Sequence, residues 1–133
     1  MRSETSYDLD GDLIVIDASL LGPTGRGTVR LVLDTGSTLT TLTPAIAEAL
    51  GYTSTDRVSR SVVRSAVAEE PGYIVRMAQL STLGFKLSGV LVNVAELGHE
   101  IDGLLGMNVM SNFNLEIRPI EQRIILERLA PAS

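Results

Sequence analysis

Short apolar runs, separated by polar or glycine-rich breaks, dominate the hydrophobic pattern of this chain. Runs with strand character cover residues 13–21, 28–33, 38–42, 61–67, 73–80, 87–94, 114–118 and 123–129. They are rich in the aliphatic and β-branched residues that strands prefer. Helical signals are confined to two short segments. The pattern therefore predicts an all-β domain, and a barrel rather than alternating strands and helices.

The two helical segments are residues 43–50 and 107–113. In the first, Thr43 suits the N-cap and Pro44 suits the first helical position. Gly51 follows where a helix commonly ends in a left-handed residue. The second segment is long enough for about two helical turns. We therefore expect a barrel with one or two short helices.

Polar turns predict how the strands are joined. Residues 22–27 are rich in Gly and Pro and would close a first hairpin. Residues 68–72 (Ala-Glu-Glu-Pro-Gly) would close a second hairpin with an exposed tip, and residues 119–122 a third. Residues 1–12 are polar and are expected to form a loose lead-in. The remaining residues, 13–130, are expected to form a single domain.

Composition excludes several classes of function. The chain has 133 residues and a formal net charge of −5, without a basic stripe, which argues against nucleic acid as a partner. It has no Cys, which excludes disulfides, thiolate zinc sites and a thiol nucleophile. His99 is the single histidine, so a His-rich metal site is excluded as well. We expect no metal and no cofactor.

The N-terminal residues are polar and do not form a signal peptide. No apolar run approaches the roughly 20 residues that a membrane helix needs. We therefore expect a soluble protein without a membrane segment, and the absence of Cys and of a signal favours a cytoplasmic location. Both a full-length protein and a domain of a longer one are compatible with the sequence.

The apolar strand 28–33 runs directly into a carboxylate, Asp34. An ionised Asp at the end of a buried strand costs free energy unless a partner stabilises it or a reaction uses it. Gly36 suits a tight turn that directs the carboxylate away from the packed layer. Two interpretations follow from the residues: a functional carboxylate, or a turn Asp that caps its own loop in an unrelated barrel.

Two motifs in this order resemble those of the retropepsin-like aspartic proteases. The motifs are Asp34-Thr35-Gly36-Ser37 and Leu104-Leu105-Gly106. The resemblance covers residues 13–129, because an N-terminal hairpin, a covering hairpin and a C-terminal helix and strand also come in the family's order. It implies a closed acid-protease β-barrel with a flap hairpin. Residues 103–108 are closer in form to bacterial and cellular members than to viral ones.

The chain carries one Asp-Thr-Gly motif, whereas two-lobed pepsin-like enzymes carry two. The resemblance therefore implies a symmetric homodimer in which the two copies of Asp34 meet on the two-fold axis. Adjacent carboxylates share one proton. The ionised one would take a proton from the water that attacks a peptide carbonyl, and the protonated one would donate to the developing oxyanion. The implied function is an aspartic endopeptidase that acts on peptide or protein substrates.

The family pattern also implies roles for the neighbouring residues. The Thr35 hydroxyls of the two subunits would brace the two loops against each other. Gly36 would leave room for the substrate backbone, and the Ser37 hydroxyl would hydrogen-bond the outer oxygen of Asp34. The second motif would pack behind this loop, with the side chains of Leu104 and Leu105 near the pocket walls. The flap would comprise Ala66, Val67, Ala68, Glu69, Glu70, Pro71, Gly72 and Tyr73.

The sequence departs from viral members at three positions. Those members often carry acidic residues after the active-site motif and an Arg after the later Gly, whereas this chain has Thr38, Leu39 and Met107. An alternative interpretation is therefore a dimeric binding or scaffold module that keeps the fold without turnover. A third is an unrelated, monomeric β-barrel that binds a small apolar ligand. The enzyme is favoured because Asp, Thr, Gly and Ser all stand where the chemistry needs them.

Other charged residues receive no functional role at this stage. His99 lies in a polar loop and is expected on the surface. Arg57, Arg60, Arg64 and Arg76 are expected on exposed faces rather than in a binding patch.

Overall fold

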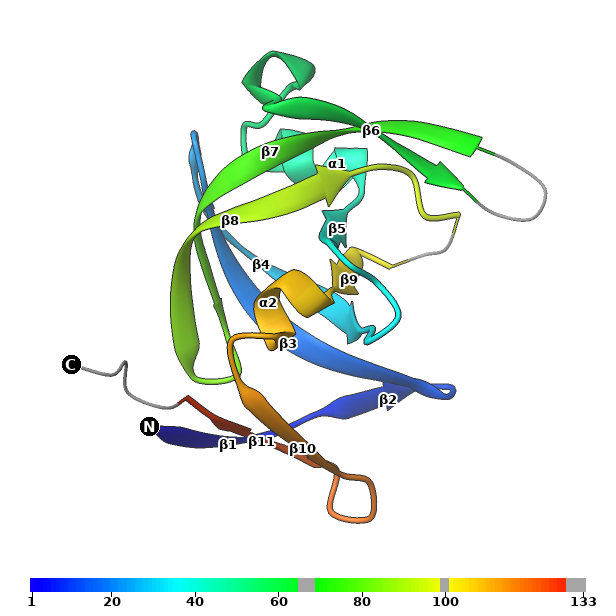
Figure 1. Cartoon of the computed structure of the whole chain (residues 1–133). Coiled ribbons are helices and arrows are strands. Elements are labelled where there is room, and N and C mark those ends of the chain that lie inside the picture. The colour runs from blue at the N-terminus through cyan, green and yellow to red at the C-terminus, as the bar shows by residue number, and fades with distance from the viewer. Residues whose placement is uncertain (65–68, 99–100, 129–133) are drawn as a thin grey trace.

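The computed structural model describes residues 1–64, 69–98 and 101–128 (Figure 1). The strands are β1 (Arg2–Ser6), β2 (Asp8–Asp10), β3 (Leu13–Gly22), β4 (Gly25–Leu33), β5 (Thr40–Leu42), β6 (Ser59–Arg64), β7 (Glu69–Thr82), β8 (Phe85–Val94), β9 (Gly103–Leu105), β10 (Asn114–Arg118) and β11 (Arg123–Glu127). The helices are α1 (Pro44–Ala49), the 3-10 turn η1 (Ser54–Asp56) and α2 (Met107–Met110). The predicted all-β class is confirmed. No helix in the described ranges is long and apolar enough to cross a membrane.

The larger of the two sheets curls into a ring. Its strand order is β2-β3-β4-β9-β5-β8-β7-β6, and an additional pairing joins β3 to β7. This pairing closes a circuit through β3, β4, β9, β5, β8 and β7, and Figure 1 shows these strands wrapped around a common interior. Closure removes most of the exposed strand edges that an open sheet would leave. The ring-like sheet that the resemblance implied is therefore present.

The interior of the ring is filled by aliphatic side chains. Because side chains alternate across a strand, every second residue of a ring strand can point inward. Leu20, Leu31, Val75 and Leu105 come from four different strands, and all are wholly buried. Burying each such side chain stabilises the fold by roughly 1.5–3 kcal/mol. With no Trp in the chain, aliphatic packing supplies most of the core.

The first ten residues form strands rather than a loose lead-in, so that prediction was wrong. β1 pairs antiparallel with β11, from Arg2 opposite Glu127 to Ser6 opposite Arg123, and β2 pairs with β3. β1 is the edge strand of its sheet and its side chains are all polar, so backbone pairing with β11 rather than apolar burial holds it in place. The predicted domain limits, residues 13–130, stay a prediction.

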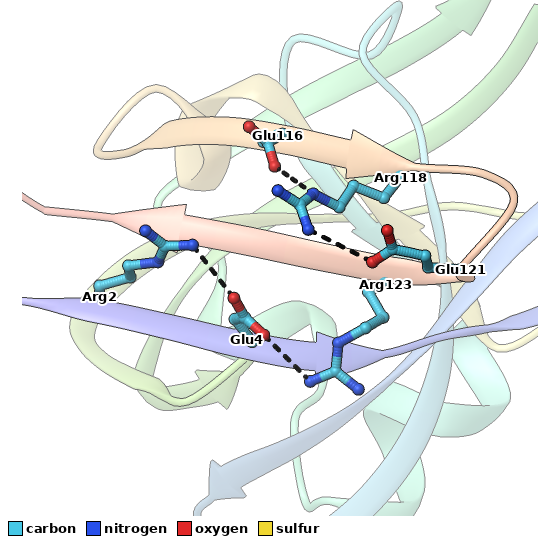
Figure 2. A network of polar contacts seen from close by, with 6 residues as sticks. All are labelled: Arg2, Glu4, Glu116, Arg118, Glu121 and Arg123. Carbon is cyan, nitrogen blue, oxygen red and sulfur yellow. Dashed lines mark hydrogen bonds and ion pairs between the residues drawn. The ribbon is translucent and has the colours of Figure 1, made fainter.

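β1, β11 and β10 form a separate three-stranded sheet. Its inner face buries Ile124 and Leu126 against the barrel. Its outer face carries two chains of exposed ion pairs, which Figure 2 shows across the three strands. Their members are Arg2–Glu4–Arg123 and Glu116–Arg118–Glu121, with nitrogen–oxygen distances of 2.6–3.4 Å. Such solvated pairs typically contribute about 0–1 kcal/mol each.

The hairpin of β6 and β7 differs from its prediction. A turn was predicted at residues 68–72, but Glu69 to Gly72 belong to β7, and Pro71 lies opposite Val62. Only β6 pairs with this part of β7, so Pro can be accommodated where its nitrogen faces the unpaired side. Residues 65–68, which connect the two strands, lie outside the described residues.

The helix α2 is shorter than the predicted segment 107–113. It ends at Met110, because the Asn112 side chain donates hydrogen bonds to the backbone oxygens of Asn108 and Val109 (3.2 and 2.9 Å). These bonds satisfy carbonyls that would otherwise accept from a further helical turn.

Candidate active site

Asp34 begins the loop that connects β4 to β5, and β9 holds both ends of this loop. β9 pairs in parallel with β4, placing Leu33 opposite Leu105, and antiparallel with β5, placing Thr41 opposite Leu104. The ladder continues into the loop, because the backbone N–H of Asp34 donates to the Leu105 oxygen (3.0 Å). A strand of only three residues therefore positions the loop at both ends.

A local turn orients the Asp34 carboxylate. The backbone N–H of Gly36 donates to Asp34 Oδ1 (2.9 Å), and the N–H of Ser37 donates to the Asp34 carbonyl (3.2 Å). A Cβ atom at position 36 would lie 3.2 Å from Oδ1, so glycine keeps this approach open. The second oxygen, Oδ2, has no hydrogen-bond partner within the described residues. One oxygen is thus fixed, and the other remains available.

Ser37 does not take the role that the family pattern implied. Its hydroxyl donates to the Leu39 carbonyl (2.8 Å) rather than to Asp34. Since a hydroxyl has a single proton, it cannot also donate to the carboxylate. The Ser37 hydroxyl therefore holds the end of the loop at Leu39, while the backbone of Gly36 supplies the hydrogen bond to Asp34.

The start of α2 supports the loop from below. The backbone N–H groups of Met107 and Asn108 donate to the carbonyls of Ser37 and Thr38 (2.7 and 3.0 Å). The first N–H groups of a helix have no partners within the helix, so they are free to bind another segment. These bonds keep Thr38 in the loop, and β5 begins at Thr40 rather than at the predicted residue 38.

Asn108 joins three elements beneath the loop, and sequence analysis missed this. Its Oδ1 accepts from the backbone N–H and the hydroxyl of Thr40 (2.8 and 3.0 Å), and its Nδ2 donates to the Leu91 carbonyl (2.7 Å). Thr40 is wholly buried, and its hydroxyl oxygen also accepts from the N–H of Gly106 (3.1 Å). We call Thr40, Asn108, Leu91 and Gly106 the loop-support network. The signal that could have revealed it was Thr40 itself, a hydroxyl residue at the start of the short strand that follows the Asp34 loop.

The glycine of the second motif is explained by close backbone packing. A Cβ atom on Gly106 would lie 2.5 Å from the carbonyl carbon of Leu39 and 2.8 Å from the backbone nitrogen of Thr40. No side chain fits there without moving the loop. Gly106 therefore lets α2 approach the loop closely enough to donate its hydrogen bonds.

The two leucines of the second motif lie in different places. Leu105 is wholly buried in the core. Leu104 is half-buried and lines a cavity of about 440 Å³ beside Asp34. The other residues that line this cavity are Leu13, Val32, Leu33, Leu97 and Ile101. Sequence reasoning missed Leu13, Leu97 and Ile101, because three distant segments meet only in the folded chain. The result is an apolar pocket with one carboxylate.

The remaining predicted site residues are only partly described. Thr35 is exposed at the tip of the loop. Ala66, Val67 and Ala68 of the predicted flap lie outside the described residues, as does His99, whereas Glu69 to Tyr73 belong to β7. Tyr73 is half-buried, and its pKa is raised by burial and, to a smaller extent, by the negative charges of Glu48 and Asp56. Among the described residues no group of three acidic, His or Cys side chains could hold a metal ion.

Comparison with known proteins places this site in a family. Residues 17–109, which include both motifs, match the aspartyl protease family. The fold is similar to that of a retropepsin-like aspartic protease from Rickettsia conorii, with a TM-score of 0.74, 20% identity, and coverage of 96% of this chain and 92% of that one. It is also similar to the retroviral protease-like domain of Ddi1 from Leishmania major, with a TM-score of 0.62, 13% identity, and coverage of 90% and 92%.

No curated protein matches the sequence. At these identities the two structures establish the fold, and the family match covers well over half of the chain. The fold is of the retropepsin type, and the chain belongs to the aspartyl protease family.

Proposed function

We propose that this protein is an aspartic endopeptidase that acts as a homodimer, with one Asp34 from each subunit. The observation that carries the proposal is the state of the Asp34 carboxylate, which is fixed through Oδ1 by the Gly36 N–H and open at Oδ2 beside an apolar pocket. A carboxylate that only capped its own turn would not need such a pocket.

The requirement for a second subunit follows from the chemistry. Hydrolysis needs a base for the attacking water and an acid for the developing oxyanion, and one carboxylate cannot hold both states. Asp102 does not supply the second carboxylate, because its side chain accepts from the backbone N–H of Arg30 (2.9 Å) and does not line the pocket beside Asp34. Thr35, exposed at the loop tip, is available to meet its counterpart.

In the proposed dimer the two Asp34 side chains share one proton and hold a water between them. The ionised carboxylate takes a proton from the water while the oxygen of that water attacks the scissile carbonyl carbon. The protonated carboxylate donates its proton to the carbonyl oxygen, and a tetrahedral diol forms. Collapse of this intermediate breaks the carbon–nitrogen bond as a proton passes to the leaving amine. The pocket lined by Leu104 and Ile101 would take an apolar side chain next to the cleaved bond.

The test is the substitution Asp34→Asn. It is expected to abolish cleavage of a peptide library between about pH 4 and pH 7, where a carboxylate pair works, and to leave the folded dimer intact. Asp12→Asn, which changes an exposed carboxylate in a turn, is the matched control and should cleave normally. Full activity of Asp34→Asn would overturn the proposal.

A second candidate function is a dimeric binding module without turnover. It is favoured by the replacement of acidic and arginine positions by Thr38, Leu39 and Met107, which leaves backbone hydrogen bonds to hold the loop. Cleavage that depends on Asp34 would reject this candidate. A purified dimer that cleaves no peptide in the library would support it.

A further inference from the structure

A second groove, separate from the pocket beside Asp34, runs along the outer side of β8 next to α2. It measures about 490 Å³. Three cations line it, Arg76 from β7, Lys86 from β8 and Arg128 just after β11, and no carboxylate does. In a chain of net charge −5, a groove lined by cations alone is unexpected. We call it the basic groove.

A local break in the barrel brings these cations to one side. In the C-terminal half of β8 the core residues are Val92 and Val94, and the polar Asn93 between them is also buried. In the N-terminal half Leu87, of opposite parity to the valines, packs against the core. The inward face therefore switches near Gly89, which has a φ of 68° and lacks the ladder pairing expected with Ala78. Residues on both sides of this switch, from Lys86 to Leu91, therefore line one groove. Gly89 thus marks a change of facing within a strand that is otherwise continuous.

The cations of the basic groove are not neutralised by their own chain. Arg76 Nη1 donates to the carbonyl of Gly89 (3.0 Å), and the Arg128 guanidinium lies 5.9 Å from the ring centre of Phe113. Within the described residues neither of them, nor Lys86, forms an ion pair. By contrast, Arg2, Arg30, Arg118 and Arg123 each form an ion pair, and Arg26 of β4 instead donates to the neutral side chain of Gln79 (3.1 Å). Three neighbouring positive charges without counterions attract an anion.

The basic groove also touches the support of the candidate active site. Leu39, at the end of the Asp34 loop, and Asn108, of the loop-support network, are among its lining residues. A polypeptide segment in the groove would therefore lie beside the loop that carries Asp34, but outside the apolar pocket. The groove contains apolar as well as charged positions, since Leu87 and Val90 also line it. This mixture suits a peptide better than a free inorganic ion.

We propose that the basic groove binds an acidic segment of a protein substrate, remote from the bond that is cleaved. Glu and Asp side chains would pair with Arg76, Lys86 and Arg128, and charge-assisted hydrogen bonds of this type are among the stronger polar contacts. The identification of the segment as part of a substrate rests on the proposed protease function, whereas binding in the groove does not.

Binding is measured first, without any requirement for cleavage. A fluorescent peptide with four consecutive Glu residues is titrated with the Asp34→Asn protein, and its anisotropy is followed. Binding is expected, and Arg76→Glu or Lys86→Glu should each weaken it by about tenfold, which corresponds to about 1.4 kcal/mol. Arg57→Glu is the matched control, because Arg57 is also exposed and donates to a single backbone carbonyl (3.0 Å). It should bind as the parent does.

Any of three results would overturn the proposed binding in the groove. The Asp34→Asn parent does not bind the Glu peptide, a matching Gln peptide binds equally well, or Arg57→Glu weakens binding as much as Arg76→Glu does. Tighter, Arg76-dependent binding of a short single-stranded oligonucleotide would also overturn the choice of an acidic peptide. Circular dichroism of each variant checks the fold, and Lys86→Ala repeats the measurement with a milder change.

Cleavage is measured second. Two peptides share one cleavage sequence, and one of them carries the Glu extension. The ratio of their kcat/KM values should exceed one, fall towards one in Arg76→Glu, and keep its value in Arg57→Glu. If the Glu peptide binds but neither peptide is cleaved, the proposed protease function is rejected and the proposed binding in the basic groove is supported. If both peptides are cleaved with equal kcat/KM and the Glu peptide does not bind, the proposed binding in the basic groove is rejected and the proposed protease function is supported.

Discussion

Two polar networks of this protein differ in almost every property. The loop-support network of Thr40, Asn108, Leu91 and Gly106 is neutral and largely buried, and its bonds join β5, β8, α2 and the residue before α2. The ion pairs of Figure 2 are charged and exposed, and they lie on the outer face of a small sheet. Buried hydrogen bonds are costly to break, whereas exposed ion pairs are screened by water. The neutral network should therefore contribute far more to stability and to the geometry of the site.

The largest effect is expected from Asn108→Ala. The substitution leaves the backbone N–H of buried Thr40 and the carbonyl of Leu91 without their partners. At about 1–3 kcal/mol for each of these two unsatisfied groups, the free energy of unfolding should fall by about 2–6 kcal/mol. Urea denaturation measures this, and peptide cleavage should fall with it. A loss below about 0.5 kcal/mol would mean that the network does not support the loop.

Gly106→Ala tests the same region through packing. The added methyl group would lie within 2.5 Å of the Leu39 backbone, so the loop or α2 must move. Overpacking of this kind costs about 1–3 kcal/mol. Cleavage should fall more steeply than stability, because displacement of the loop also moves Asp34. The measurement compares the loss in kcat with the shift in the denaturation midpoint. Gly98→Ala is the control, because its added methyl group meets open space and strains only the backbone.

Arg118→Ala tests the exposed network. It removes two ion pairs, to Glu116 (2.6 Å) and to Glu121 (3.3 Å), yet the midpoint of urea denaturation should stay close to that of the parent, because both pairs are exposed. Added salt should shrink even this difference, because exposed charges are screened. A loss comparable to that of Asn108→Ala would erase the contrast between the two networks.

The smallest effect is a pH dependence at Tyr73, which lies at the base of the β6–β7 hairpin. Burial raises the pKa of Tyr73 in the folded chain above 10.0, its ordinary value, and the negative charges of Glu48 and Asp56 add to the shift. Above pH 10 the unfolded chain therefore loses this proton first. The contribution of Tyr73 to stability is present below pH 10 and is lost as the pH rises through the folded pKa. In Tyr73→Phe, denaturation between pH 9 and pH 11 should show a weaker decline than in the parent.

The strands with a covered face were predicted well from the sequence. β10 has the predicted bounds, and β3 and β4 differ from theirs by three residues or fewer, because alternation between a covered and an open face is visible in the residues themselves. β1 was missed because an edge strand with polar side chains lacks this pattern. The second hairpin turn was predicted at the wrong residues, because Pro71 and Gly72 are residue types typical of turns although both belong to β7.

The sequence predicted the motif residues of the candidate site, but not the contacts that hold the loop in place. Asp34 and Gly36 could be assigned because the motif is local. The partner of Ser37, the bridge through Asn108 and the pocket wall at Leu97 depend on contacts between residues far apart in the sequence. Local patterns carry no information about which distant segments will meet. The basic groove was missed for the same reason, since Arg76 alone is an ordinary exposed residue.

The placement of β9 also governs when the loop around Asp34 can become ordered. This loop is held by Leu105, Met107 and Asn108, which are made about seventy residues after Asp34. Contacts of such long sequence separation form slowly and only once both partners are available. A nascent chain that has not reached residue 103 has no ordered loop around its carboxylate. Any function that depends on this ordered loop therefore has to wait until the segment up to Asn108 has been made and folded.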